Sequence, residues 1–328
     1  MTLETDSKHS FGQKHVLDLD SFTKQEITHV LDNTVAMEQV LDREIRKVPA
    51  LRGKTVVTLF YESSTRTRVS FEQAAKILSA DVINVSSGGS SAKKGESLYN
   101  TALTIQAMQA DIIVIRHPHS GAPHFLARQL KSNIINAGDG THAHPTQSLL
   151  DLYTIRKNIG DIEGKKIVIV GDILYSRVAR SNLWGLTKMG ARVVICGPQT
   201  LIPNDFLNGH RTEEGHPFAG VEVQTDLDTA LKDADVIMTL RLQLERQRAG
   251  HLPSLREYSQ TYGINARRLA IAKDGALVMH PGPMNEGVEI ETDIAHGAQS
   301  VIEEQVKSGV AVRMSLLYSM AAGQNLEI

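Results

Sequence analysis

The chain has 328 residues, of which 41% are apolar and 22% are charged, and its formal net charge is −2. This length suits two domains, the composition is that of an ordinary globular protein, and the near-neutral charge gives no basic field for gripping nucleic acid. The single cysteine, Cys196, excludes an intrachain disulfide and any metal site with several cysteine ligands. With no apolar run of about 18 residues and no signal-peptide pattern, we expect a cytoplasmic protein that does not enter a membrane.

Eight short apolar runs, rich in β-branched residues, predict the buried strands of parallel sheets. They cover residues 55–60, 81–85, 111–115, 133–136, 166–170, 192–196, 235–240 and 276–279. Patterns typical of helices separate the runs, which predicts βαβ units. We therefore expect an α/β protein of two domains, each a three-layer α/β/α fold around a parallel sheet, joined by helices. One such helix begins at Pro145, because proline is favoured at the first helical position.

The first run is followed by the sequence YESSTRTR, where a strand hands over to a helix. A helix N-terminus binds anions through its free N–H groups and its partial positive charge. Ser64, Thr65 and Thr67 add hydroxyl donors, and Arg66 adds a guanidinium that suits phosphate oxygens. The alternative is simple N-capping by a serine or threonine beside solvated arginines. We favour a phosphate site, because one cap does not require so many donors.

Polar side chains also follow the later runs, and the carboxyl ends of strands are where open α/β sheets bind ligands. The residues of interest after these runs are Arg116, His144, Gln147, Arg177, Arg241, Gln243 and the turn from His280 to Pro283. Each arginine could be an ordinary surface charge, but two arginines in the second half would suit a dicarboxylate. Pro283 is a candidate for a cis peptide bond, although the turn has no other assigned role at this point.

Two further readings of these segments are weaker. The pairs His117–His119 and His142–His144 have the spacing of metal ligands, but they lie in loops without an obvious set of carboxylate partners, so we expect no metal. The sequence GDILYSR after the fifth run occupies the place of a dinucleotide fingerprint. Gly171 is followed there by neither of the other two glycines that the fingerprint requires, which argues against a nucleotide cofactor.

Taken together, the motifs resemble the aspartate/ornithine carbamoyltransferase family. The matching segments are Ser64–Arg68, Lys93–Glu96, Arg116–Pro118, His144–Gln147 and Arg241–Gln243, in the family's order from about Leu17 to the C-terminus. The His-Pro-Gly-Pro turn and the Arg-x-Gln segment are similar to the aspartate members, whereas ornithine members usually carry His-Cys-Leu-Pro. In better-known allosteric relatives the turn reads His-Pro-Leu-Pro, so Gly282 departs from that pattern.

The resemblance implies that carbamoyl phosphate and L-aspartate react to give N-carbamoyl-L-aspartate and phosphate, an early step of pyrimidine synthesis. It implies direct attack through a tetrahedral intermediate, with no cofactor and no metal. It also implies a homotrimer with shared active sites, a carbamoyl-phosphate domain of residues 1–146 plus 298–328, and an aspartate domain of residues 147–297. Some family trimers are joined by regulatory chains or by dihydroorotase-type partners, and the sequence leaves this open.

The resemblance also assigns roles to residues. The catalytic group would be Arg66, Thr67, Lys94, Arg116 and His144. Carbamoyl phosphate would contact these residues together with Ser64, Thr65, Ser90, Gln147, Gly282 and Pro283. Aspartate would be bound by Lys94, Arg177, Arg241 and Gln243. Ser90 and Lys94 would come from the neighbouring subunit, with Ser91 an alternative to Ser90, and Val178 stands where some relatives carry a threonine.

Two other functions remain open on the sequence alone. The first is carbamoyl transfer to a different amine such as ornithine, although a cationic substrate would call for a carboxylate where this chain has Arg241 and Gln243. The second is an inactive homologue that serves as a scaffold for an active partner. A scaffold would not need the catalytic residues, and all four of those considered are present, which argues against it: Arg66, Lys94, Arg116 and His144.

Overall fold

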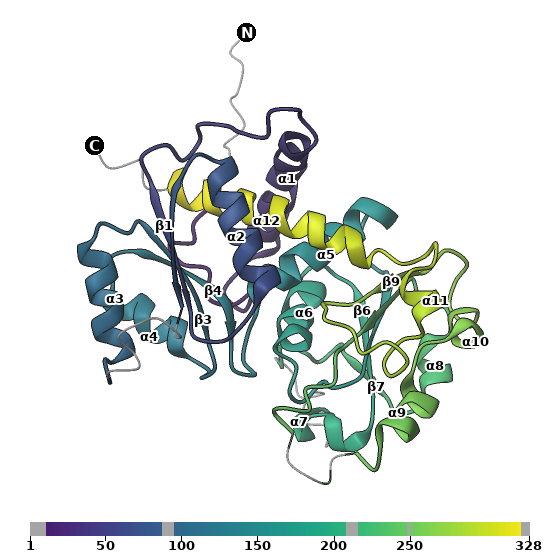
Figure 1. The fold of residues 1–328 in the computed structure, drawn as a ribbon. Helices are drawn as coiled ribbons and strands as arrows, with labels where there is room; N and C mark the ends of the chain where they lie inside the picture. Colours follow the sequence, from purple (N-terminus) through teal and green to yellow (C-terminus); the bar gives the residue numbers. More distant parts are fainter. Residues whose placement is uncertain (1–10, 87–94, 208–215, 248–249, 251, 323–328) are drawn as a thin grey trace. The chain divides into compact units, whose positions relative to one another are not determined.

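The computed structural model describes residues 11–86, 95–207, 216–247, 250 and 252–322, which fall into two compact units (Figure 1). Unit 1 takes the chain up to His117, Ala122–Ala137 and the part from Val310 onwards, and unit 2 takes Pro118–Gly121 and Gly138–Gly309. Each unit contains one parallel sheet with helices beside it. The predicted α/β class with two parallel sheets is therefore confirmed.

The sheet of unit 1 has the strand order β2-β1-β3-β4. The strands are β1 (Thr55–Phe60), β2 (Asp81–Ser86), β3 (Ile112–His117) and β4 (Asn133–Asp139). Val57 of β1 lies level with Ile83 of β2 on one side and with Ile113 of β3 on the other. The three strands therefore end together, which brings the segments that follow them to one edge of the sheet.

The helices of unit 1 are α1 (Lys24–Leu41), α2 (Thr65–Ile77), α3 (Leu98–Ala107) and α4 (Ala122–Gln129). Ala102 and Ile105 of α3 and Leu126 of α4 pack against the face of the sheet that carries Val57 and Ile113. Burial of the larger of these side chains, Ile105 and Leu126, is worth about 1.5–3 kcal/mol each when complete and holds this layer together. The last helix, α12 (Ile302–Ala322), contributes its C-terminal part to unit 1, where Arg313 donates a hydrogen bond to Ser70.

The sheet of unit 2 has the strand order β7-β6-β5-β8-β9. The strands are β5 (Lys166–Val170), β6 (Arg192–Cys196), β7 (Glu222–Gln224), β8 (Val236–Thr239) and β9 (Leu277–Met279). Val168 and Val170 belong to one core cluster, and Ile167 and Ile169, which alternate with them, are equally buried. Both faces of β5 are therefore covered, as its unbroken apolar sequence predicts.

The helices of unit 2 are α5 (Pro145–Ile159), α6 (Arg177–Lys188), α7 (Asn204–Leu207), α8 (Leu227–Leu231), α9 (Leu255–Tyr262), α10 (Ala266–Leu269) and α11 (Thr292–Ala295), with a 3-10 turn at Gln199–Leu201. Arg268 of α10 reaches the end of α9, where its guanidinium donates to the carbonyl oxygens of Gln260, Thr261 and Gly263 at 2.6–2.9 Å. The last carbonyls of a helix have no partner within it, so Arg268 closes this end of α9.

All eight predicted strands are present, and two differences have physical causes. β7 was missed, because it is a three-residue edge strand with one apolar residue, Val223, and shows no apolar run. The expectation that β2 is buried was wrong: it is an edge strand, and Ile83 is 47% exposed. In the part of the chain that the structure describes, no helix has the length and apolar character needed to cross a membrane.

Candidate active site

In unit 1, helix α2 begins directly after the Ser63-Ser64 pair that follows β1. Ser64 occupies the N-cap position, yet its side chain makes no capping hydrogen bond. Ser97 and Ser176, by contrast, cap α3 and α6 by accepting from main-chain N–H groups at 3.1 Å. The alternative interpretation, in which the motif serves only to cap the helix, is therefore not supported at Ser64. The first turn of α2 keeps the features that an anion would use, which are N–H groups, hydroxyls and Arg66.

Arg116 lies at the same edge of the sheet, because it is level with Phe60, the last residue of β1. Its side chain is 13% exposed, pairs with Glu62 at 3.1 Å and donates to the carbonyl oxygen of Ala137 at 3.2 Å. Two anchors on one guanidinium restrict its rotamers, so Arg116 is held in place before any ligand arrives.

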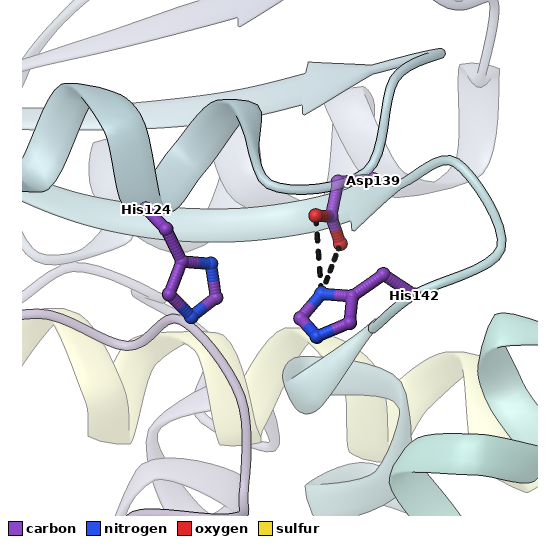
Figure 2. A group of neighbouring side chains, drawn as sticks. All are labelled: His124, Asp139 and His142. Atoms are coloured by element: carbon purple, nitrogen blue, oxygen red, sulfur yellow. Dashed lines mark hydrogen bonds and ion pairs between the residues drawn. The ribbon is translucent and has the colours of Figure 1, made fainter.

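Asp139, at the end of β4, organises the loop that leads to His144. The carboxylate is fully buried and accepts from the N–H groups of Gly121 at 2.7 Å and Ala143 at 3.0 Å. Figure 2 shows the ring of His142 facing it, with Nδ1 at 3.2 Å from the nearer oxygen. His142 therefore points at Asp139, and the neighbouring His144 is placed by the main chain that Asp139 fixes.

His144 and Gln147 stand at the start of α5. His144 is 4% exposed, and its main-chain N–H donates to the hydroxyl of Ser181 on α6 at 2.9 Å. Pro145 takes the first helical position, as predicted, and Gln147 follows within the first turn with 8% exposure. The two predicted carbamoyl contacts are thus close in sequence, well buried and positioned by the α5–α6 pair.

Arg177 and Arg241 both follow strands of the second sheet. Arg177 is the first residue of α6, is 4% exposed, and donates to the carbonyl oxygen of Gly140 at 3.2 Å. Arg241 lies two residues beyond β8, whose Thr239 is level with Val170 of β5. Because parallel strands of matching register end at one edge, both arginines belong to the carboxyl edge of this sheet.

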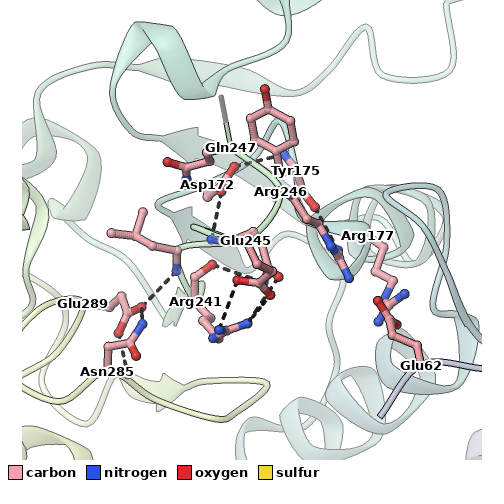
Figure 3. Close-up of polar contacts among 12 residues, drawn as sticks. Glu62, Asp172, Tyr175, Arg177, Arg241, Glu245, Arg246, Gln247, Asn285 and Glu289 are labelled. Atoms are coloured by element: carbon pink, nitrogen blue, oxygen red, sulfur yellow. Dashed lines mark hydrogen bonds and ion pairs between the residues drawn. The ribbon is translucent and has the colours of Figure 1, made fainter. Parts of the chain in front are cut away.

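Arg241 is held by an acidic neighbour. Its two terminal nitrogens lie 2.7 and 3.2 Å from the carboxylate oxygens of Glu245, four residues further on (Figure 3). Gln243 also touches Arg241, with its Oε1 at 3.5 Å from Nη1. The bidentate pair with Glu245 fixes the plane of the Arg241 guanidinium. The remaining N–H groups of the guanidinium stay available for a second anion.

Two buried carboxylates, which the sequence analysis missed, hold the main chain around Arg241 (Figure 3). Asp172 is fully buried and accepts from the N–H of Gln243 at 3.1 Å, and Glu289 is 1% exposed and accepts from the N–H of Leu242 at 2.9 Å. Burial raises the pKa of both carboxyl groups, and their hydrogen bonds partly offset this by favouring the charged form. Consecutive peptide groups of this segment are therefore fastened to two fixed acceptors.

The same carboxylates reach further segments of unit 2. Asp172 accepts from the N–H of Tyr175 at 2.9 Å and from the side chain of Gln247 at 2.8 Å. Glu289 accepts from the main chain and side chain of Asn285, both at 2.7 Å. One signal for Asp172 was visible in the sequence, because it lies two residues beyond the strand β5. Glu289 gave no such signal, since its partner Leu242 lies 47 residues away.

The His280–Pro283 turn follows β9. The peptide bond between Gly282 and Pro283 is cis, as predicted, and Gly282 has a φ of 63°. The N–H of Gly282 donates to Nδ1 of His280 at 2.8 Å, which fixes the ring of this buried histidine. The turn therefore presents one defined main-chain surface at the carboxyl edge of the second sheet.

Gly171 follows β5, at the position that the first glycine of a dinucleotide fingerprint would occupy. Gly171 has a φ of 123°, and a Cβ atom built on it would lie 2.7 Å from the hydroxyl of Tyr258. Tyr258 is 2% exposed, and burial raises its pKa well above the ordinary value. The missing side chain of Gly171 thus makes room for a tyrosine of the protein itself.

The predicted residues Ser90 and Lys94, and the alternative Ser91, lie outside the described residues. The other predicted site residues fall into two groups, one in each unit. Unit 1 holds Ser64, Thr65, Arg66, Thr67 and Arg116, and unit 2 holds His144, Gln147, Arg177, Arg241, Gln243, Gly282 and Pro283. In unit 2, Arg177, Arg241 and Gly282 lie on segments that follow β5, β8 and β9, which are neighbours in the second sheet.

Comparison with known proteins places the whole chain in one family. Residues 14–157 match the model of the aspartate/ornithine carbamoyltransferase carbamoyl-P binding domain, and residues 163–320 match the Asp/Orn binding domain. The chain is 59% identical over 310 residues to the aspartate carbamoyltransferase catalytic subunit of Roseiflexus sp. (strain RS-1), covering 94% of this chain and 95% of that protein.

Solved structures agree with the sequence comparison. The aspartate transcarbamoylase of Trypanosoma cruzi in complex with carbamoyl phosphate and aspartate matches with a TM-score of 0.83 and 30% identity, over 93% of this chain and 96% of that one. The ornithine carbamoyltransferase of Pyrococcus furiosus matches with a TM-score of 0.81 and 28% identity, over 94% of this chain and 97% of that one. Both domain models are matched in order along almost the entire sequence, and the chain therefore belongs to the aspartate/ornithine carbamoyltransferase family.

Proposed function

We propose that this chain is an aspartate carbamoyltransferase, which transfers the carbamoyl group of carbamoyl phosphate to the amine of L-aspartate. The products are N-carbamoyl-L-aspartate and phosphate, and the reaction belongs to pyrimidine synthesis. The observation that carries the choice of substrate is the charge arrangement at the carboxyl edge of the second sheet. Relatives named as aspartate carbamoyltransferase catalytic subunits, at 53–59% identity, support it.

Charge favours aspartate as the amine that receives the carbamoyl group. Arg177 and Arg241 offer guanidinium groups that suit the two carboxylates of aspartate, and Gln243 adds an amide. Three acidic groups lie beside this segment. Asp172 and Glu289 are buried and turned towards main-chain N–H groups, and Glu245 is paired with the guanidinium of Arg241. They are poorly placed to receive the second ammonium group of ornithine, which would need a carboxylate facing it. This favours a dicarboxylate over a diamine.

The phosphate of carbamoyl phosphate would be held at the start of α2. Ser64, Thr65 and Thr67 supply hydroxyls, Arg66 supplies a guanidinium, and the first turn of the helix supplies N–H groups. The missing capping bond of Ser64 supports this assignment, because it leaves the hydroxyl for a ligand. Gly282 and Pro283 would shape the pocket around the same substrate.

The reaction requires no covalent intermediate with the protein. The unprotonated amine of aspartate attacks the carbamoyl carbon, and negative charge develops on the carbamoyl oxygen, where Arg116, His144 and Thr67 would donate hydrogen bonds. Each such donor typically lowers the barrier by about 3–4 kcal/mol. The tetrahedral intermediate then collapses: the bond between the carbamoyl carbon and the bridging oxygen breaks, and phosphate leaves with that oxygen and the electron pair. The attacking nitrogen loses a proton in the process, and the leaving phosphate is the nearest base of the reaction.

The quaternary arrangement is part of the proposal. In a homotrimer, Ser90 and Lys94 would reach the phosphate bound by a neighbouring chain, where Lys94 would neutralise the leaving group and also contact aspartate. We place the carbamoyl-phosphate domain at residues 1–146 plus 298–328 and the aspartate domain at residues 147–297, in a cytoplasmic enzyme. Regulatory or dihydroorotase-type partners are compatible with this arrangement.

A panel of amines tests the assignment. The purified chain is given carbamoyl phosphate with aspartate, ornithine or a neutral amino acid, and carbamoylated product and phosphate are measured together. We expect aspartate to react fastest, with succinate as a competitive inhibitor against it. Faster carbamoylation of ornithine would overturn the substrate, and a folded, trimeric chain without turnover on any amine would support the scaffold alternative.

A further inference from the structure

A buried carboxylate holds the side-chain amide of Gln147. Gln147 Nε2 donates to Oδ1 of Asp151, one helical turn further along α5, at 3.0 Å. Asp151 is fully buried, and Gln147 is 8% exposed. An amide carries its donors on the nitrogen and its acceptor on the oxygen, so this bond fixes which way the amide is turned. With its nitrogen on the Asp151 side, Gln147 directs Oε1 away from Asp151.

Two more amides converge on the same carboxyl group. Gln305 of α12 donates through Nε2 to Oδ1 of Asp151 at 2.8 Å, and Asn182 of α6 donates through Nδ2 to Oδ2 at 2.8 Å. Both side chains are buried. A carboxylate offers acceptors only, so each amide must turn its nitrogen towards it. The orientation of Gln147 is thus dictated by hydrogen-bond chemistry and not by shape alone.

The network continues to the turn that follows β9. The Oε1 atom of Gln305 accepts from the N–H of His280 at 3.0 Å. His280 in turn accepts from the N–H of Gly282 at 2.8 Å. Asp151 is therefore linked to Gln147 within α5 and, through Gln305, to the turn that contains Gly282, which is distant in sequence.

We propose that Asp151 is a positioning residue that orients Gln147 for the carbamoyl group. With Oε1 directed away from Asp151, Gln147 can accept an N–H from the carbamoyl amine, whereas a rotated amide would set donor against donor. The inference rests on the proposed function, because the partner of Oε1 is the amine of carbamoyl phosphate. Asp151 itself does not touch the substrate.

Replacing the carboxylate separates orientation from packing. Asp151→Leu keeps the branched shape of the side chain, with two methyl groups in place of the two oxygens, but removes every acceptor, so Gln147 is free to rotate. We expect the KM for carbamoyl phosphate to rise about tenfold, the value of one well-placed hydrogen bond. The inhibition constant of inorganic phosphate should not change, because phosphate lacks the amine that Gln147 recognises. General distortion of the site would weaken both ligands together.

A conservative variant should restore the orientation. In Asp151→Asn one acceptor oxygen remains for Gln147 and Gln305, and the new nitrogen faces Asn182. Among the residues that the structure describes, the buried Oδ1 atom of Asn182 has no hydrogen-bond partner, so this amide can rotate and accept from that nitrogen. We expect Asp151→Asn to keep a KM for carbamoyl phosphate within about threefold of the unchanged chain. Thr154→Val, a buried polar change on the same helix, is the matched control.

A double-variant cycle tests whether Asp151 acts through Gln147. The combination of Gln147→Ala with Asp151→Leu should have the same KM for carbamoyl phosphate as Gln147→Ala alone, since there is no amide left to orient. If Asp151→Leu does not fold, Asp151→Ser gives the same comparison, because its hydroxyl is too short to reach Gln147. Folding is checked by circular dichroism for every variant.

The possible results distinguish failure of the positioning role from failure of the proposed function. Additive losses in the double variant, or an unchanged KM for carbamoyl phosphate in folded Asp151→Leu, would overturn the positioning role while leaving the proposed function intact. Absence of aspartate carbamoylation by the unchanged chain would instead refute the proposed function. A raised KM in Asp151→Leu, recovery in Asp151→Asn and non-additivity with Gln147→Ala together support the inference.

Discussion

Arg267 and Arg268 are adjacent arginines with the same charge and a shared partner, Asp228, yet their environments differ. The side chain of Arg267 is 64% exposed, whereas that of Arg268 is 8% exposed and also closes the end of α9 through three carbonyl oxygens. Replacing each in turn by methionine removes one charge and keeps most of the side-chain volume. The pair therefore separates a buried helix cap from a surface ion pair.

The expected magnitudes follow from these contacts. An exposed ion pair contributes about 0–1 kcal/mol, so Arg267→Met should lower the free energy of unfolding by no more than that. Hydrogen bonds from a charged donor contribute about 1.5–3 kcal/mol each, but the freed carbonyl groups near the surface recover part of this from water. We expect Arg268→Met to cost about 3–5 kcal/mol, in the range found when one partner of a buried polar network is removed.

The measurement is urea unfolding followed by far-ultraviolet circular dichroism, with the tryptophan fluorescence of Trp184, in unit 2, as a second probe. Arg268→Met should move the fluorescence midpoint to clearly lower urea, and Arg267→Met should leave it almost in place. Equal midpoints for the two variants would refute the reasoning, because they would mean that the carbonyl contacts of Arg268 do not stabilise unit 2.

Two further predictions concern the proposed activity, and a third concerns the pH dependence of stability. Arg66→Ala should fold normally and lose most of its activity, since Arg66 is exposed at the start of a helix; near-normal turnover in the folded variant would remove it from the site. Inactive Lys94→Ala and Arg66→Ala trimers, dissociated together and reassembled, should regain activity if sites are shared between chains, and a dead mixture with proven hybrids would contradict sharing. Burial raises the pKa of Glu289 from 4.5, so its contribution to stability is full below that pH and is lost as pH rises through the raised value. Relative to Glu289→Gln, the unchanged chain should therefore lose unfolding free energy as pH increases across this window, and parallel pH profiles of the two proteins would contradict this.

The sequence predicts elements well where a local pattern decides them. The runs that became β1, β5 and β6 match those strands residue for residue, because parallel strands buried on both faces require unbroken apolar sequence. The edge strand β7 has no such requirement, and Val223 alone does not form a pattern. The cis bond before Pro283 was also foreseen, since only a proline makes it common.

The supporting residues of the site were beyond local reasoning. Asp151 is joined to Gln305 across 154 positions, and Glu289 is joined to Leu242 across 47. In the sequence, a carboxylate that will be buried cannot be told from an ordinary surface residue, because its hydrogen-bond donors are distant along the chain. The residues that would touch substrates follow strands and can be found from the strands, but the residues that would hold them in place depend on the completed fold.

The turn after β5 explains why this fold need not be a nucleotide site despite its strand–glycine–helix order. In a dinucleotide fold, the space above such a glycine is left for the pyrophosphate of the cofactor. Here the hydroxyl of Tyr258 lies where a side chain at Gly171 would begin. The hydroxyl of Tyr258 occupies the space that a Rossmann-type turn leaves for the cofactor. Gly171 is therefore explained by close packing within the protein and does not indicate a nucleotide site.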